Sequence, residues 1–270
     1  MRAQARALAA ILWVAITSVT ALLLLPDAVA GLPEAWGADL GMSASIRFGV
    51  SAAMILAGVL GVVLFRPGLR LGGGRIALLA LPVALVLILV LLAIALAAGV
   101  AIRNPVAAVP ASLMGIGLAA ILAQVIGEEL LLRGLLQPIL VDAWGKGPGV
   151  LASAGLFTLI HVAGGWDDPV SLLNITLAGI WFGLLALRTG GLLAPILAHF
   201  GYNWGEEALI GAYPNPGVGD FGAVFDFDLA GPAILGGSVD GFNASLVLSV
   251  LLALAVLPLA WPRRGEGAGE

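Results

Sequence analysis

The chain has 270 residues, of which 61% are hydrophobic and only 10% are charged, and its mean hydropathy is +1.10. Because soluble domains carry about a quarter of their residues as charged side chains, this chain has too little charge to cover a surface that faces water. It contains no cysteine, which excludes disulfides, thiol catalysis and thiolate metal sites. The net charge of −4 and the scattered basic residues give no support to nucleic-acid binding.

Eight apolar runs have the length of membrane-spanning helices. A helix needs about 20 mostly apolar residues to cross a bilayer, and hydrocarbon offers no partner to an unpaired backbone group. Pro26 is expected to end the first span and Pro138 the fourth. The predicted fold class is therefore all-α, a polytopic membrane helical bundle with about eight transmembrane helices. The predicted spans cover residues 7–25, 46–65, 76–101, 110–136, 149–165, 170–187, 191–209 and 243–261.

The flanking basic residues predict the orientation of the bundle. In an eight-span arrangement only Arg47 and Arg103 lie opposite to the other flanking Lys and Arg residues, and Arg133 lies inside the fourth span. Since positive flanks mark the cytoplasmic side, both termini are predicted to be cytoplasmic. The cytoplasmic set is Arg2, Arg6, Arg66, Arg70, Arg75, Lys146, Arg188, Arg263 and Arg264, and the acidic residues opposite include Glu34, Asp39, Asp220, Asp226, Asp228 and Asp240.

The first run also has features of a secretory signal peptide, with two arginines before it and Ala-Val-Ala at residues 28–30. The run from Ala7 to Leu25 is longer than the usual apolar region of about 7–15 residues, which favours an uncleaved first span.

The chain divides into three predicted parts. Residues 1–109 hold three spans in which no recognisable chemistry is found. Residues 110–210 hold the spans with polar motifs. Residues 211–270 hold an external loop, rich in Gly, Pro and Asp, and the last span.

The fourth predicted span contains two adjacent carboxylates. Ionisable side chains within a span cost about 2.5–3.5 kcal/mol on insertion scales, so they are candidates for function. Glu129 and Arg133 are four residues apart on one helical face and can form an ion pair. Glu128 lies about 100° round the helix, on the same face as Gln124, and is left free to act as a general base.

The only two histidines of the chain lie in two further spans. A single histidine in a core is usually a packing residue, but two beside a pair of glutamates favour a shared site. His199 and Asn203 are four residues apart on one face. From the rise of 1.5 Å per residue, Glu128, His161 and His199 are expected about 12 to 18 Å from the cytoplasmic ends of their spans. They are therefore expected to meet in the cytoplasmic half of the bilayer.

These residues resemble three motifs of the CAAX-protease and bacteriocin-processing family, called CPBP or Abi, whose members are intramembrane proteases. The resemblance covers residues 110–205, and the motifs occur in the family's order on separate spans. They are Glu-Glu-x-x-x-Arg at Glu128, Glu129 and Arg133, Phe-x-x-x-His at Phe157 and His161, and His-x-x-x-Asn at His199 and Asn203.

The resemblance implies an intramembrane endopeptidase. Glu128 would activate the attacking water and His161 would position or polarise it. His199 and Asn203 would hold the scissile carbonyl group and stabilise its oxyanion. The supporting residues Glu129, Arg133 and Phe157 would keep the site in shape.

The need for a metal ion stays open. Glu128, His161 and His199 would suit Zn²⁺, which takes three protein ligands and a water in catalytic sites. The His-Glu-x-x-His motif is absent, however. Members of the family have been described both as metalloproteases and as glutamate-dependent proteases without an obligatory metal.

Other polar residues have simpler interpretations. Glu206 and Glu207 are expected to be solvated at the external end of their span, with a role in admitting water to the site as the alternative. Asn174 and Thr176 are expected to form interhelical hydrogen bonds, and Gly179 and Gly183 to permit close packing of helices.

Two other functions fit intramembrane Glu, His and Asn residues. One is a proton-coupled transporter, which would require paired repeats that the sequence does not show. The other is a non-catalytic immunity or scaffold protein of the same fold. The predicted substrate of a protease is a membrane-anchored or membrane-proximal peptide or protein. The Ala-, Gly- and Leu-rich composition favours the plasma membrane of a prokaryote, and the sequence carries no signal for oligomeric state.

Overall fold

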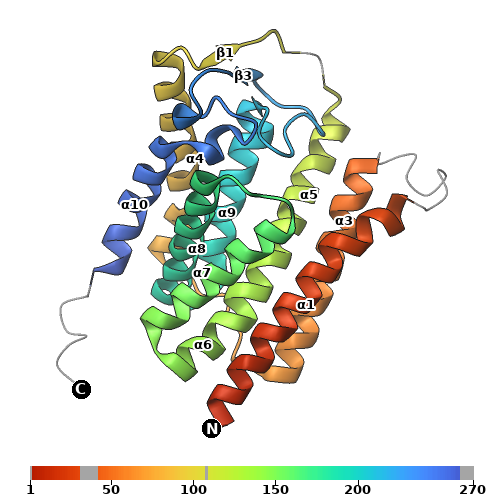
Figure 1. Cartoon of the computed structure of the whole chain (residues 1–270), viewed down its shortest axis with the longest axis vertical. Helices are drawn as coiled ribbons and strands as arrows, with labels where there is room; N and C mark the ends of the chain where they lie inside the picture. Colours follow the sequence, from red (N-terminus) through yellow and green to blue (C-terminus); the bar gives the residue numbers. More distant parts are fainter. Residues whose placement is uncertain (1, 31–41, 107–108, 262–270) are drawn as a thin grey trace.

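The computed structural model describes residues 2–30, 42–106 and 109–261. Long helices pack side by side into one bundle, and the connections at one end of it carry short strands (Figure 1). Among the residues used to predict the orientation, Glu34, Asp39, Arg263 and Arg264 lie outside the described residues.

Each predicted span corresponds to helix in the structure. The first three are α1 (Arg2–Ala30), α3 (Met42–Phe65) and α4 (Arg75–Ala97). The fourth is a continuous helical stretch of α5 (Ala111–Glu129), the π-helix η1 (Leu130–Leu136) and α6 (Gln137–Trp144). The others are α7 (Lys146–Ala163), α8 (Pro169–Thr189), α9 (Leu193–Trp204) with the π-helix η2 (Gly205–Ile210), and α10 (Leu246–Ala260).

In the described part of the chain, five helical stretches are long and apolar enough to cross a membrane: residues 2–29, 42–65, 75–97, 111–144 and 169–189. The helix α10 is apolar but shorter. These helices support a multi-pass membrane protein with an α-helical bundle. The count of eight crossings and the cytoplasmic position of the termini stay predictions.

Two prolines do not end helices where the sequence predicted it. Pro26 lies inside α1, which continues to Ala30. Pro138 lies in the first turn of α6, directly after the π-helix, and the helical path continues to Trp144. Proline lacks an N–H group and is tolerated in the first turn of a helical segment, so the change from π-helix to α-helix accommodates it.

The segment expected to be an external loop contains short strands. β1 (Ala101–Arg103) pairs antiparallel with β3 (Phe227–Leu229), and β3 pairs parallel with β2 (Ala212–Tyr213). The short 3₁₀-helices η3 (Ala233–Leu235) and η4 (Gly241–Ala244) follow. Phe227, Leu229 and Phe242 are buried in the same core cluster as residues of α4, α8 and α9. Strands of two or three residues are too short to show a periodicity of two in the sequence.

Glycines let the helices around the site approach closely, as predicted for Gly179 and Gly183. A Cβ atom on Gly179 would lie 3.1 Å from Cβ of Ala154 on α7. A Cβ atom on Gly183 would lie 2.7 Å from Oε1 of Gln137 on α6. Because α8 carries hydrogen in place of these side chains, its backbone carbonyl groups come within reach of polar side chains on η1 and α6.

Candidate active site

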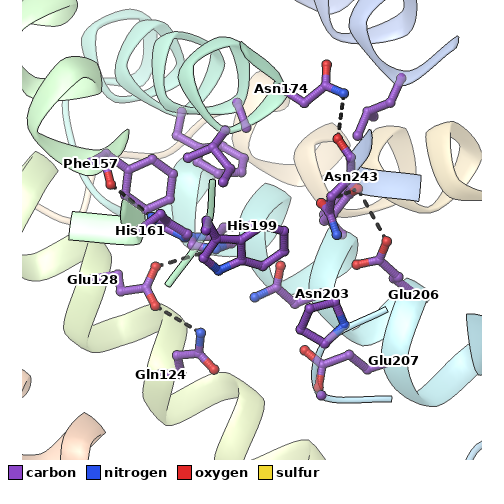
Figure 2. A pocket seen from close by; sticks show the side chains of 18 of the residues that line it. Gln124, Glu128, Phe157, His161, Asn174, His199, Asn203, Glu206, Glu207 and Asn243 are labelled. Carbon is purple, nitrogen blue, oxygen red and sulfur yellow. Dashed lines mark hydrogen bonds and ion pairs between the residues drawn. The ribbon is translucent and has the colours of Figure 1, made fainter. Parts of the chain in front are cut away.

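Glu128 is fixed by Gln124 one helical turn before it. Nε2 of Gln124 donates a hydrogen bond of 2.9 Å to Oε1 of Glu128. The other oxygen, Oε2, is buried, has no hydrogen-bond partner among the described residues and lies 3.8 Å from Nε2 of His199. Figure 2 shows this carboxylate facing the two histidines. Glu128 therefore has one oxygen that is held and one that is available to a water molecule.

Glu129 is fully buried and holds two partners. Its Oε1 accepts hydrogen bonds from Nη1 of Arg133 at 3.0 Å and from Nδ1 of His199 at 2.9 Å. Nη2 of Arg133 donates to the backbone oxygen of Gly179 at 3.0 Å, and the guanidinium group lies over the rings of Phe157 and Phe182. The predicted ion pair is confirmed. It joins η1, α8 and α9 and sets the orientation of the His199 ring.

The two histidine rings are each held by one nitrogen. Nδ1 of His161 contacts the backbone oxygen of Phe157 at 2.9 Å, so that nitrogen carries the hydrogen. Phe157 packs edge-on against both rings, with centroid distances of 4.4 Å to His161 and 5.9 Å to His199. The His199 ring also stacks on Phe182. Both rings consequently have Nε2 left for another group.

A cavity of about 280 Å³ brings the predicted residues together. It is lined by Glu128, Phe157, His161, His199 and Asn203, which come from α5, α7 and α9. The amide of Asn203 is partly exposed and has no hydrogen-bond partner among the described residues, so it can bind a ligand in the cavity. Glu129 and Arg133 lie behind this wall rather than in it.

Two of the three helices with catalytic candidates, α5 and α9, change to π-helix directly beyond them. η1 begins after Glu129, and η2 begins after Trp204, the neighbour of Asn203. π-Helical turns are rare and frequently occur at functional sites. Their wider turns change which side chains face the cavity, which residue spacing alone did not predict.

The cavity reaches the segment that connects η2 to α10. Its wall includes Pro216 and Gly217, from the segment predicted to be external. His161 is the third residue from the end of α7, about 22 Å along the helix from Lys146 at a rise of 1.5 Å per residue. The predicted meeting of Glu128, His161 and His199 is thus confirmed. Their expected position in the cytoplasmic half of the bilayer stays a prediction.

A second ion pair closes the cavity and was missed. Nη1 and Nη2 of Arg47 on α3 bind both carboxylate oxygens of Glu207 at 2.6 and 2.7 Å. Nε of Arg47 donates to Oε1 of Gln124 at 2.7 Å, and Gln124 in turn holds Glu128. Arg47 thus brings one residue of the first three predicted spans, where the sequence showed no recognisable chemistry, to the wall of the cavity. An arginine and a carboxylate at the same end of two spans could have indicated this pair.

The glutamates beyond Asn203 are buried, contrary to the expectation that they are solvated. Glu206 and Glu207 are only 4% and 7% exposed. The hydroxyl group of Tyr202 lies 3.5 Å from Oε1 of Glu206, and both glutamates line the cavity (Figure 2). They are buried because η4 and residues 215–217 cover this end of α9, which helix periodicity does not reveal.

The expected interhelical hydrogen bonds are confirmed. Nδ2 of Asn174 donates to the backbone oxygens of Asn243 and Ser245 at 2.8 and 2.9 Å, which ties α8 to the start of α10. Thr176 on α8 and Thr158 on α7 share a hydrogen bond of 2.8 Å.

The donor chemistry of the site suits a metal, but the arrangement does not. Two imidazole Nε2 atoms and one carboxylate are the donor types that Zn²⁺ takes. Within the described residues, however, no group of three His, Asp or Glu side chains is placed to hold a metal ion. The free oxygen of Glu128 lies 3.8 Å from Nε2 of His199.

The bundle and the site define a multi-pass helical membrane protein with a buried Glu–His centre. Residues 110–205 match the family model described as type II CAAX prenyl endopeptidase Rce1-like, which confirms the resemblance to CPBP intramembrane proteases. This match supports a CAAX-type protease at the level of the family. It includes every motif residue from Glu128 to Asn203, whereas Arg47 and Glu207 lie outside it. No curated protein and no solved structure matches the chain.

Proposed function

We propose that the protein is an intramembrane endopeptidase in which Glu128 activates the attacking water. The observation that carries this proposal is the carboxylate of Glu128, which is held at Oε1 and unpartnered at Oε2 beside His199 in a cavity. A general base must lie within hydrogen-bond reach of the proton that it removes. A water bound at Oε2 meets this requirement.

The other residues have separate roles in the proposed reaction. Water bound between Glu128 and Nε2 of His161 transfers a proton to Glu128 as its oxygen attacks the scissile carbonyl carbon. Asn203 donates its amide N–H to the developing oxyanion. His199 donates from Nε2 when the ring carries hydrogens on both nitrogens. Glu128 then passes the proton to the leaving amine as the C–N bond breaks.

Glu129 and Arg133 are positioning residues. Their ion pair is completely buried, and Glu129 holds His199 through Nδ1. A water-excluded site keeps hydrogen-bond donors in fixed directions, which increases their effect on developing charge. Removal of this pair would therefore disturb both the fold and the site.

The substrate that we propose is a peptide attached to, or inserted in, the membrane. A second cavity of about 440 Å³ adjoins the first and shares Glu128 and His161 with it. It is lined by apolar side chains of α1, α3, η1 and α7, among them Leu22, Val50 and Met54. An apolar side chain or anchor of the substrate fits there while the scissile bond lies at Glu128. We also place the protein in a prokaryotic plasma membrane, on the basis of its composition.

The test is cleavage by the full chain reconstituted in lipid. Wild type and Glu128→Gln are incubated with prenylated and transmembrane peptides, and the products are identified by mass spectrometry with and without a chelator. Cleavage by wild type alone supports the proposed base, and sensitivity to the chelator would add a metal to the site. Equal cleavage by both proteins contradicts the role of Glu128. No cleavage of any peptide by wild type favours a non-catalytic membrane partner.

A further inference from the structure

A separate cavity lies at the end of the bundle where α3 and α8 end. It measures about 550 Å³ and does not include any residue that lines the catalytic cavity. Four arginines line it, and Asp142 is the one acidic residue of the wall among the described residues. The four are Arg6, Arg66, Arg70 and Arg133.

Two of these arginines are exposed and have no partner. Arg66 and Arg70 make no side-chain hydrogen bond or ion pair with the residues that the structure describes. Asp142 lies 3.7 Å from Arg6, and its side chain is 69% exposed, so it offsets little of the positive charge. The cavity therefore presents an excess of positive charge.

The base of the cavity holds a buried donor and a buried acceptor that are not satisfied. Arg133 and Gln137 are only 3% and 2% exposed, and both line the cavity. Nε of Arg133 and Oε1 of Gln137 have no hydrogen-bond partner among the described residues. Buried polar groups of this kind cost free energy unless a ligand or water satisfies them. The Arg133 side chain has no exposed surface, so the groups that a ligand in the cavity can contact directly are those of the exposed arginines.

The walls of the cavity are preformed. Nη2 of Arg6 donates to the backbone oxygens of Phe65 and Arg66, which fixes the end of α3. The backbone of Arg70 accepts a hydrogen bond from the N–H of Leu192, at the start of α9. Gly72 has a φ of 67°, and a Cβ atom there would lie 2.7 Å from the backbone of Gly191. The segment that carries Arg66 and Arg70 is thus attached firmly to α8 and α9.

The geometry points to a binding site for the phosphodiester headgroup of an anionic glycerophospholipid. Phosphate oxygens accept charge-assisted hydrogen bonds from guanidinium groups, which supplies partners for Arg66 and Arg70. The basic flanks predict that this end of the bundle faces the cytoplasmic leaflet, whose surface carries anionic lipids. The site does not depend on the proposed protease activity, since its occupancy is measured without cleavage.

The test is lipid binding by the purified full chain in a neutral detergent. Native mass spectrometry and thermal unfolding are followed as phosphatidylglycerol, phosphatidylcholine or free glycerol phosphate is added. The variant is Arg66→Gln with Arg70→Gln. The matched control is Arg75→Gln with Arg103→Gln, which removes the same charge from two exposed arginines outside the cavity. We expect phosphatidylglycerol to bind wild type and control alike, and the variant about tenfold more weakly or worse, because two charge-assisted contacts are lost.

Each result decides the proposal. Tight binding of phosphatidylglycerol with weak binding of glycerol phosphate assigns the site to a membrane lipid. Comparable binding of the two, lost in the variant, assigns it to a phosphate ester of either source. Binding that is the same in variant and control, or the same for phosphatidylcholine, overturns the proposal and leaves water as the occupant of the cavity.

Discussion

Two buried arginine–glutamate pairs support the site from opposite sides, and they differ in how they are built. Glu129 and Arg133 lie four residues apart on one helical path and are both inaccessible to solvent. Arg47 and Glu207 are 160 residues apart in the chain, join α3 to η2, and keep side-chain exposures of 15% and 8%. The first pair sets His199, whereas the second sets Glu128 through Gln124. Glu128 and His199 are therefore oriented by different ion pairs.

The largest expected effect comes from breaking the inner pair. Arg133→Met leaves the carboxylate of Glu129 buried without its cation, and loss of one partner from a buried pair costs about 3–5 kcal/mol. The thermal unfolding midpoint in detergent should fall strongly, and activity should be lost because Glu129 no longer holds His199 in place. A double variant, Glu129→Gln with Arg133→Met, should recover part of the stability. A midpoint for Arg133→Met equal to that of wild type would contradict a structural role for the pair.

Breaking the outer pair should cost less stability. Glu207→Gln keeps the size of the side chain but removes the charge that binds Arg47, and a buried group left without its partner costs about 1–3 kcal/mol. The cleavage rate kcat should fall while KM changes little, because Gln124 loses its orientation rather than the substrate its contacts. Asp220→Asn, a charge removed elsewhere on the wall of the adjoining cavity, is the control. A rise in KM alone would show that Arg47 and Glu207 serve substrate binding instead.

A smaller effect is expected at the residue that connects the outer pair to the base. Gln124→Leu removes the hydrogen bond to Oε1 of Glu128 but keeps a side chain of similar volume. Loss of one such hydrogen bond to a charged group is worth about 1.5–3 kcal/mol, which corresponds to a decrease in kcat of about tenfold or more. Gln124→Glu tests the importance of the donated hydrogen bond in a second way, because it replaces the amide donor with another carboxylate beside Glu128 and Glu207. If kcat were unchanged in Gln124→Leu, this result would contradict the proposal that Arg47 orients Glu128 through Gln124.

The smallest effect on catalysis is expected away from both pairs. Asn174→Ala removes the hydrogen bonds between α8 and the start of α10 and should lower the free energy of unfolding by about 1–3 kcal/mol. Because Asn174 holds elements that cover the cavity rather than a catalytic side chain, kcat should stay within about twofold of wild type, equivalent to less than 0.5 kcal/mol. Unfolding in detergent and cleavage kinetics on the same preparation measure both quantities. A large decrease in kcat with unchanged stability would place Asn174 in the reaction itself.

The comparison of the two pairs also shows what the sequence could predict. Apolar runs predicted the helices, because a chain in hydrocarbon must satisfy its backbone hydrogen bonds internally and a helix does so. The helical spacing of four residues predicted the pair of Glu129 with Arg133 and the contact of Gln124 with Glu128. No local pattern connects Arg47 with Glu207, since their contact depends on how α3 packs against α5 and η2. The sequence also did not predict which segments enclose the cavity, because this depends on where α7 ends and on how segment 211–245 folds back over the helices.

The central claim is that two adjacent carboxylates have different functions, and Glu128→Gln measured beside Glu129→Gln tests it most directly. Cleavage of a membrane peptide and the thermal unfolding midpoint are determined for both variants and wild type in the same lipid. We predict that Glu128→Gln abolishes cleavage and keeps the midpoint of wild type, whereas Glu129→Gln lowers both because it leaves Arg133 unpaired. Normal stability with equal loss of cleavage in both variants, or cleavage retained by Glu128→Gln, would contradict the account.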